Sequence, residues 1–92
     1  MKWETAINNF KSYLKIERGL SDNSIVSYEK DILKLSNFIL NKNKSISPLK
    51  VSPDLIKEFI YSISKSISSS SQSRIISGLR SFFEYLIFEK YI

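Results

Sequence analysis

Apolar side chains recur every three or four residues over most of this chain, which is the spacing of one face of an α-helix. The pattern predicts a first helix from about Glu4 to Glu17, ended by Gly19, because glycine readily adopts the left-handed conformation that stops a helix. A second helix follows Ser21, whose hydroxyl suits the cap position. The two apolar faces are Trp3, Ile7, Phe10 and Leu14, and Ile25, Tyr28, Ile32, Leu35 and Ile39.

The second helix is expected to fade over residues 41–44 into a loop that passes through Pro48. Ser52, Pro53 and Asp54 predict the start of a third helix, with serine as cap, proline in the first position and an acid in the first turn. Its apolar face is Leu55, Ile56, Phe59, Ile60 and Ile63.

Residues 62–73 hold eight serines, which predicts a frayed helix end followed by a turn. A fourth helix is expected to begin near Ser70 or Ser71 and to reach about Phe88. It would bury Ile75, Leu79, Phe82, Phe83 and Leu86. The predicted architecture is therefore a compact, all-α, four-helix domain that occupies residues 1–92.

Composition narrows the function classes. At 92 residues the chain is one domain, and two Gly and two Pro provide few of the tight turns that an all-β fold needs. The absence of Cys and His excludes zinc sites, disulfides, thiol nucleophiles and histidine acid–base chemistry, and we expect neither a cofactor nor a metal. No signal peptide and no run of 18 apolar residues occurs, so we expect a cytoplasmic protein with no membrane contact.

The net charge of +5 is concentrated in the middle of the chain. Residues 32–83 hold eight Lys or Arg against two acids, a local charge of +6 that leaves −1 for the rest. Concentrated positive charge on a small domain favours a polyanionic partner, most often nucleic acid. The alternative is a solvated basic surface that aids solubility.

The polar face of the second helix carries a ribbon of hydrogen-bonding and cationic side chains at spacings of three and four. Lysines could contact phosphate, and asparagine or serine could contact phosphate or base edges. The alternative is an ordinary solvated face, and Glu29 and Asp31 nearby dilute its positive charge. The ribbon consists of Asn23, Ser27, Lys30, Lys34 and Asn37.

The fourth helix makes the sharper case for DNA. No acid occurs between Glu58 and Glu84, although most helices place acids in their first turn. Such a start, supplied with Arg, suits an external anion such as a phosphate, while simple serine capping is the alternative. Gly78, inside the helix, indicates close packing against a helix or a ligand. The DNA-facing residues expected here are Ser70, Ser71, Ser73, Arg74, Ser77 and Arg80.

Two segments, residues 19–32 and 73–86, resemble the two signatures of the N-terminal core-binding domain of Xer- and phage-integrase-type tyrosine recombinases. The resemblance implies a SAM-like helical domain that clamps double-stranded DNA at a recombination half-site. At the second helix it implies DNA contacts by Asn23, Ser24 and Lys30, and at the fourth by Arg74, Ser77 and Arg80. Family members usually have Thr at the place of Ser24 and often a basic residue at that of Ser81.

The catalytic residues of that family lie in a C-terminal domain, so the resemblance implies a non-catalytic fragment of a longer enzyme. That enzyme would exchange DNA strands through a 3′-phosphotyrosyl intermediate, in chromosome-dimer resolution or mobile-element integration, with other protomers in a synaptic tetramer. Two alternatives stay open. One is a protein-interaction module that uses an exposed Tyr13 and Ile16; the other is a stand-alone phage factor that occupies recombination sites without cutting.

Overall fold

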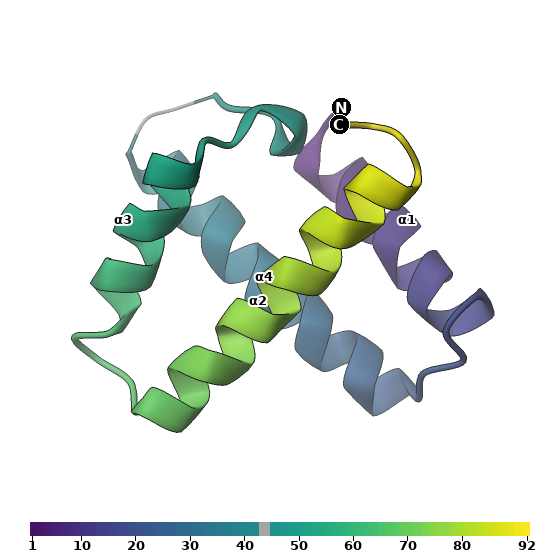
Figure 1. The fold of residues 1–92 in the computed structure, drawn as a ribbon, viewed down its shortest axis with the longest axis horizontal. Coiled ribbons are helices and arrows are strands. Elements are labelled where there is room, and N and C mark those ends of the chain that lie inside the picture. The colour runs from purple at the N-terminus through teal and green to yellow at the C-terminus, as the bar shows by residue number, and fades with distance from the viewer. Residues whose placement is uncertain (43–44) are drawn as a thin grey trace.

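The computed structural model describes residues 1–42 and 45–92. These residues form four α-helices and one short 3-10 helix, which confirms the predicted all-α, four-helix architecture (Figure 1). The predicted loop before Pro48 includes Asn43 and Lys44, which lie outside the described residues, and the 3-10 helix was not predicted. In chain order the elements are α1 (Trp3–Ile16), α2 (Asp22–Asn41), η1 (Pro48–Lys50), α3 (Pro53–Ile63) and α4 (Ser69–Phe88).

Serine side chains cap the start of three of the four α-helices. The hydroxyl oxygens of Ser21 and Ser52 accept hydrogen bonds from the backbone N–H groups three residues later, at 3.3 and 3.1 Å, as predicted. The cap of α4 is Ser68, which accepts from the Ser71 N–H at 3.2 Å, so this helix begins one to two residues earlier than expected. After α1, Gly19 has the predicted left-handed conformation with a φ of +62°.

The core lies where α1, α2 and α4 pack together, and α3 closes one side. Phe10 of α1 is fully buried, and its ring lies 5.3 Å from that of Phe82 on α4. The prediction that Tyr13 is exposed was wrong: it is half-buried, with its ring 4.8 Å from that of the buried Tyr85. Aromatic pairs between the two helices extend from Trp3 against Phe82 to Tyr13 against Phe88.

The arrangement of the helices defines two ends of the molecule. The chain termini lie together at one end, and the N-terminal ends of α2 and α4 lie at the opposite end (Figure 1). Between these ends α4 crosses α2, and the two helices make direct side-chain contact. The crossing brings the two polar faces singled out in the sequence toward one another.

Candidate nucleic-acid interface

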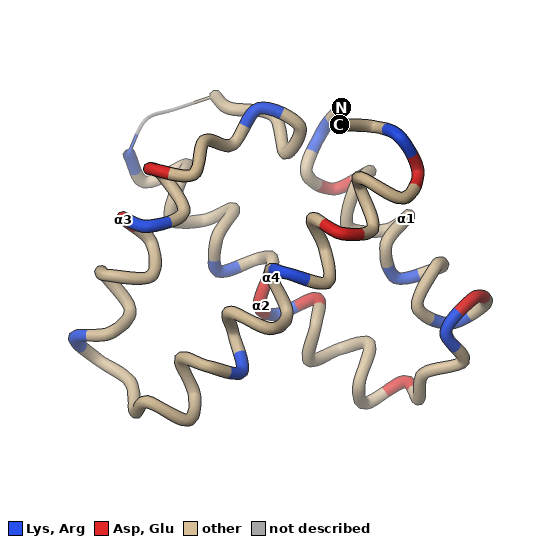
Figure 2. Tube along the Cα trace, in the orientation of Figure 1, with Lys and Arg blue, Asp and Glu red and all other residues tan. Residues whose placement is uncertain are grey.

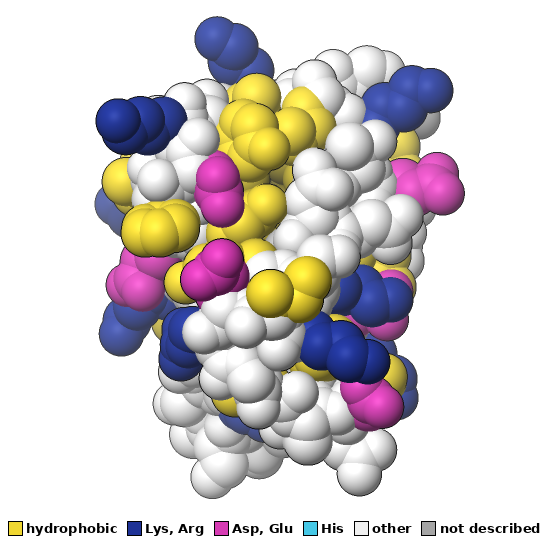
Figure 3. Space-filling model, turned by 90° about the vertical axis from the view of Figure 1, so that its right-hand side faces the viewer, with side chains coloured by type: hydrophobic (Ala, Val, Ile, Leu, Met, Phe, Trp, Pro, Cys, Tyr) yellow, Lys and Arg dark blue, Asp and Glu magenta, His cyan; other side chains and the backbone are white. Residues whose placement is uncertain are grey.

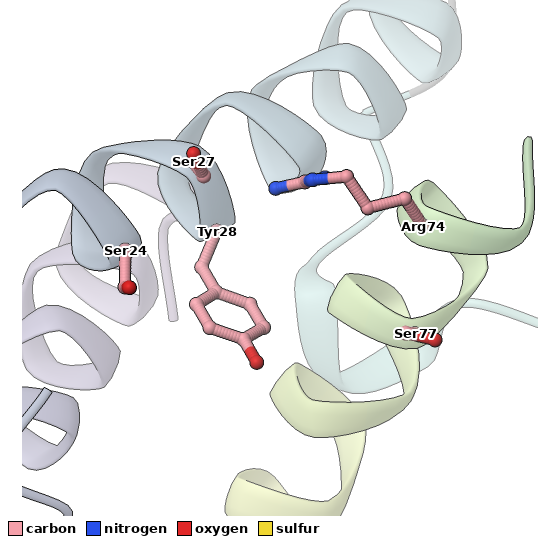
Figure 4. Close-up of a pocket in the computed structure, with 5 residues that line it drawn as sticks. All are labelled: Ser24, Ser27, Tyr28, Arg74 and Ser77. Carbon is pink, nitrogen blue, oxygen red and sulfur yellow. The ribbon is translucent and has the colours of Figure 1, made fainter. Parts of the chain in front are cut away.

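A groove runs between the N-terminal half of α2 and that of α4. It consists of two adjoining depressions that share Ser27 and Arg74, with volumes of about 250 and 220 Å³. In Figure 4 the Arg74 side chain reaches from α4 toward α2, and the Tyr28 hydroxyl points into the space between the helices. The side chains that line it are Ser24, Ser27, Tyr28, Lys30, Asp31, Lys34, Ser71, Arg74, Ile75 and Ser77.

Seven of the eleven predicted DNA-facing residues are brought together in this groove. The other four are all exposed but do not line it: Asn23 lies in the first turn of α2, and Ser70, Ser73 and Arg80 lie on α4. The seven are Ser24, Ser27, Lys30, Lys34, Ser71, Arg74 and Ser77. The geometry thus unites the two predicted faces into one surface.

Cationic side chains in and near the groove are available to an external anion. Within residues 1–42 and 45–92, none of the four ion pairs involves Lys30, Lys34 or Arg80. All three side chains belong to exposed residues. Figure 2 shows cationic positions along both helices near their crossing, with an acidic position among them.

The acid at the crossing is Asp31, which forms an ion pair with Arg74. Nη1 of Arg74 donates to both carboxylate oxygens of Asp31, each at 2.9 Å. The Asp31 side chain is only 5% exposed, whereas that of Arg74 is 50% exposed. Burial raises the pKa of Asp31 above its ordinary value of 3.8, although Arg74 and Lys34 oppose that shift. Desolvation of this carboxylate therefore outweighs the attraction of its cationic neighbours.

Gly78 provides the space that Asp31 occupies. A Cβ atom at this position would collide with the Asp31 carboxylate and would lie only 3.0 Å from its Cγ. The sequence-based expectation of close packing at Gly78 is confirmed, and the neighbour is helix α2. Only a residue without a side chain lets α4 pass over the buried acid.

Sequence reasoning missed three residues of the groove. Asp31 was treated as a dilution of positive charge, and Tyr28 and Ile75 were assigned to the core. Tyr28 is half-buried, packing edge-on against Phe10 at 6.2 Å while its hydroxyl faces the groove. The helical spacing indicated that Asp31 shares a face with the groove serines, because Ser24, Ser27 and Asp31 recur at intervals of three and four.

Two kinds of feature are absent from the part of the chain that the structure describes. None of its helices combines the length and apolarity needed to cross a lipid bilayer. No three His, Cys, Asp or Glu side chains lie close enough together to hold a metal ion.

Comparison with known proteins identifies related sequences. The family model described as "Phage integrase, N-terminal SAM-like domain" matches residues 7–90. The chain is 38% identical to the tyrosine recombinase XerD of Oceanobacillus iheyensis over 88 residues, which is 95% of this chain and 30% of the relative. It is 32% identical to the tyrosine recombinase XerC of Herpetosiphon aurantiacus over 80 residues, 87% of this chain and 26% of the relative. No solved structure shows a significant match.

These matches share one property. The chain spans less than a third of the length of each of these curated relatives while nearly all of its own length is matched. The family model describes an N-terminal domain, so the likeness concerns that domain alone.

Proposed function

The chain belongs to the phage-integrase N-terminal SAM-like family, as the core-binding domain of a Xer-type tyrosine recombinase, and on that premise we propose that it clamps duplex DNA through α2 and α4. The groove between these helices is the contact surface. Lys30, Lys34 and Arg80 bind backbone phosphates, and the serines allow the backbone to approach closely. Asn23, Ser70 and Ser73 extend this surface beyond the groove.

One observation carries this proposal: lysines of α2 that form no ion pair among the described residues, and short hydroxyl side chains of both α2 and α4, converge on one groove. A basic face on a single helix would be consistent with mere solubility. Convergence from two helices supports a common occupant, because both polar faces line the same groove. A polyanion such as DNA supplies regularly spaced charges for both helices at once.

The proposal extends to the longer protein. The relatives are tyrosine recombinases more than three times as long as the matched segment, so a C-terminal catalytic domain is expected in the parent of this domain. That parent would cut and rejoin DNA through a phosphotyrosyl intermediate, with double-stranded DNA and further protomers as partners. Residues 1–92 would contribute DNA binding and no catalytic group.

Salt-dependent binding tests the proposal. Three phosphate contacts predict a slope of about −2.7 in log K against log salt, or roughly a fortyfold loss of affinity between about 50 and about 200 mM salt. The variant Lys30→Ala/Lys34→Ala should flatten the slope by about 1.8. The control, Lys2→Ala/Lys90→Gly, removes the same charge near the termini, and glycine suits the φ of +62° at Lys90. Equal losses in the two variants would reject α2 as a DNA-binding element.

A second candidate function is contact with another protomer, favoured by an apolar surface where α1 and α4 end. Ile16 and Phe88 are 78% and 66% exposed, and the half-buried Tyr13 lies between them, with its ring 5.9 Å from that of Phe88. In the view of Figure 3, hydrophobic side chains gather in the upper half beside acidic ones, while backbone and side chains that are neither hydrophobic nor charged cover most of the lower end. Self-association measured by sedimentation velocity tests this candidate.

A further inference from the structure

The Asp31–Arg74 pair lies within the proposed DNA groove. Neither the burial of its carboxylate nor the glycine that makes room for it stabilises the fold. The carboxylate is withdrawn from water, and glycine at position 78 weakens the interior of α4. Apolar side chains of similar volume usually stabilise such a crossing at least as well as a buried ion pair. Stability alone therefore does not explain why the acid, the arginine and the glycine occur together.

The geometry of the pair leaves most of the guanidinium free. A guanidinium has five N–H donors on three nitrogens, and Asp31 engages only one of these nitrogens, Nη1. In the part of the chain that the structure describes, Nε and Nη2 have no hydrogen-bond partner, and the side chain is half-exposed. Arg74 thus crosses the groove with one end fixed and three donors available.

We propose that Asp31 is a positioning residue for Arg74, fixing its guanidinium across the groove so that Nε and Nη2 bind a DNA phosphate. The inference rests on the proposed function and deepens it. An arginine that is already ordered loses less conformational freedom when it binds, and its fork matches the oxygens of a phosphate. Because the carboxylate cancels its charge, Arg74 contributes directed hydrogen bonds more than net attraction.

A double-mutant cycle tests this coupling. Four forms of the 92-residue chain are compared for binding to a mixed-sequence duplex of about 20 base pairs at low salt, where phosphate contacts dominate: wild type, Asp31→Asn, Arg74→Gln and the double variant. Arg74→Gln should weaken binding at least about tenfold, because it removes the donors and leaves an unpaired carboxylate facing DNA. In the Asp31→Asn background, Arg74→Gln should reduce the affinity for the duplex by a factor several-fold smaller than in wild type.

Two controls separate positioning from charge and from folding. Asp54→Asn raises the net charge as Asp31→Asn does, but at an exposed site in the first turn of α3, and the cost of Arg74→Gln should be the same in this background as in wild type. Arg74→Lys keeps the charge without the fork, and it should weaken binding several-fold although the charge is unchanged. Circular dichroism verifies that each variant is folded.

The outcomes are distinct. The proposal is supported if Arg74→Gln reduces the affinity for the duplex less in the Asp31→Asn background than in wild type, and if Arg74→Lys also reduces that affinity. The positioning role of Asp31 is overturned if the wild-type chain binds DNA but Arg74→Gln weakens binding equally in the wild-type and Asp31→Asn backgrounds. It is also overturned if Arg74→Lys binds with full affinity. Either result leaves the proposed DNA-binding function intact. A wild-type chain that does not bind the duplex rejects both.

Discussion

Gly78 and Gly19 are both required where they stand, but for different physical reasons. Gly19 has a φ of +62° and open space around it, so alanine there would be strained only through its backbone. Gly78 is helical, and alanine there would collide with the Asp31 carboxylate. The difference could not be predicted from the sequence, because the neighbour of Gly78 lies on another helix.

Alanine substitutions distinguish the two glycines. Gly19→Ala should lower the free energy of unfolding by about 1 kcal/mol in any background. Gly78→Ala should lower it by about 1–3 kcal/mol, because overpacking exceeds the gain in helix propensity. In an Asp31→Ala background the Gly78→Ala loss should shrink while the Gly19→Ala loss stays the same. Urea unfolding, followed by the fluorescence of the single tryptophan Trp3, measures the two glycine substitutions in both the wild-type and the Asp31→Ala backgrounds. If Gly78→Ala cost the same stability in both backgrounds, the described contact with Asp31 would be contradicted.

Asp31 should make stability depend on pH in a defined direction. Its pKa is raised by burial, so in the interval above 3.8 the folded state holds a proton that the unfolded chain has released. Its contribution to stability is therefore present below 3.8 and is lost as pH rises through the raised folded-state pKa. The free energy of unfolding of wild type minus that of Asp31→Asn should fall over this interval. A rise in that difference would mean that the attraction of Arg74 and Lys34 exceeds desolvation.

At the scale of elements, the caps decide where the helices begin. Ser21 and Ser52 were recognisable in the sequence because each directly precedes a clear apolar period. The start of α4 was misplaced because residues 68–71 are all serine, and any of them could cap a helix. In the structure Ser68 is the cap, and the helix includes serines that the pattern assigned to the turn.

Serine-to-alanine substitutions identify the cap that operates. Ser68→Ala should lower the free energy of unfolding by about 1 kcal/mol, because the Ser71 N–H loses its acceptor. Ser69→Ala and Ser70→Ala, whose hydroxyls make no hydrogen bond among the described residues, should change it by less than about 0.5 kcal/mol. Urea unfolding of the three variants gives the comparison. A larger loss in Ser70→Ala than in Ser68→Ala would place the start of α4 where the sequence pattern had it.

At the scale of the whole molecule, how much could be predicted depended on whether a property belongs to one helix or to several. The helices and the polar faces that line the groove follow from periods along single segments, so they were predictable. The exposure of Tyr13 and the pairing of Asp31 with Arg74 depend on which helix lies opposite, and no single-helix period encodes that. The predictions that were wrong or missing therefore concern residues where one helix packs against another.

The separation of the polar groove from the apolar surface of Ile16 and Phe88 predicts that two activities can be removed independently. Ile16→Glu/Phe88→Glu should abolish self-association while the affinity for duplex DNA falls by less than about threefold, because the added acids lie outside the groove. Lys30→Ala/Lys34→Ala should weaken DNA binding and leave self-association unchanged.

Salt distinguishes the two activities a second time, since it screens phosphate contacts but not the burial of apolar surface. Raising salt from about 50 to about 200 mM should weaken DNA binding steeply and leave the sedimentation coefficient at a given protein concentration unchanged. Sedimentation velocity with and without duplex measures both activities in one series. If Ile16→Glu/Phe88→Glu lost DNA binding as fully as Lys30→Ala/Lys34→Ala, the chain would bind DNA only as an assembled oligomer, and the two surfaces would act as one.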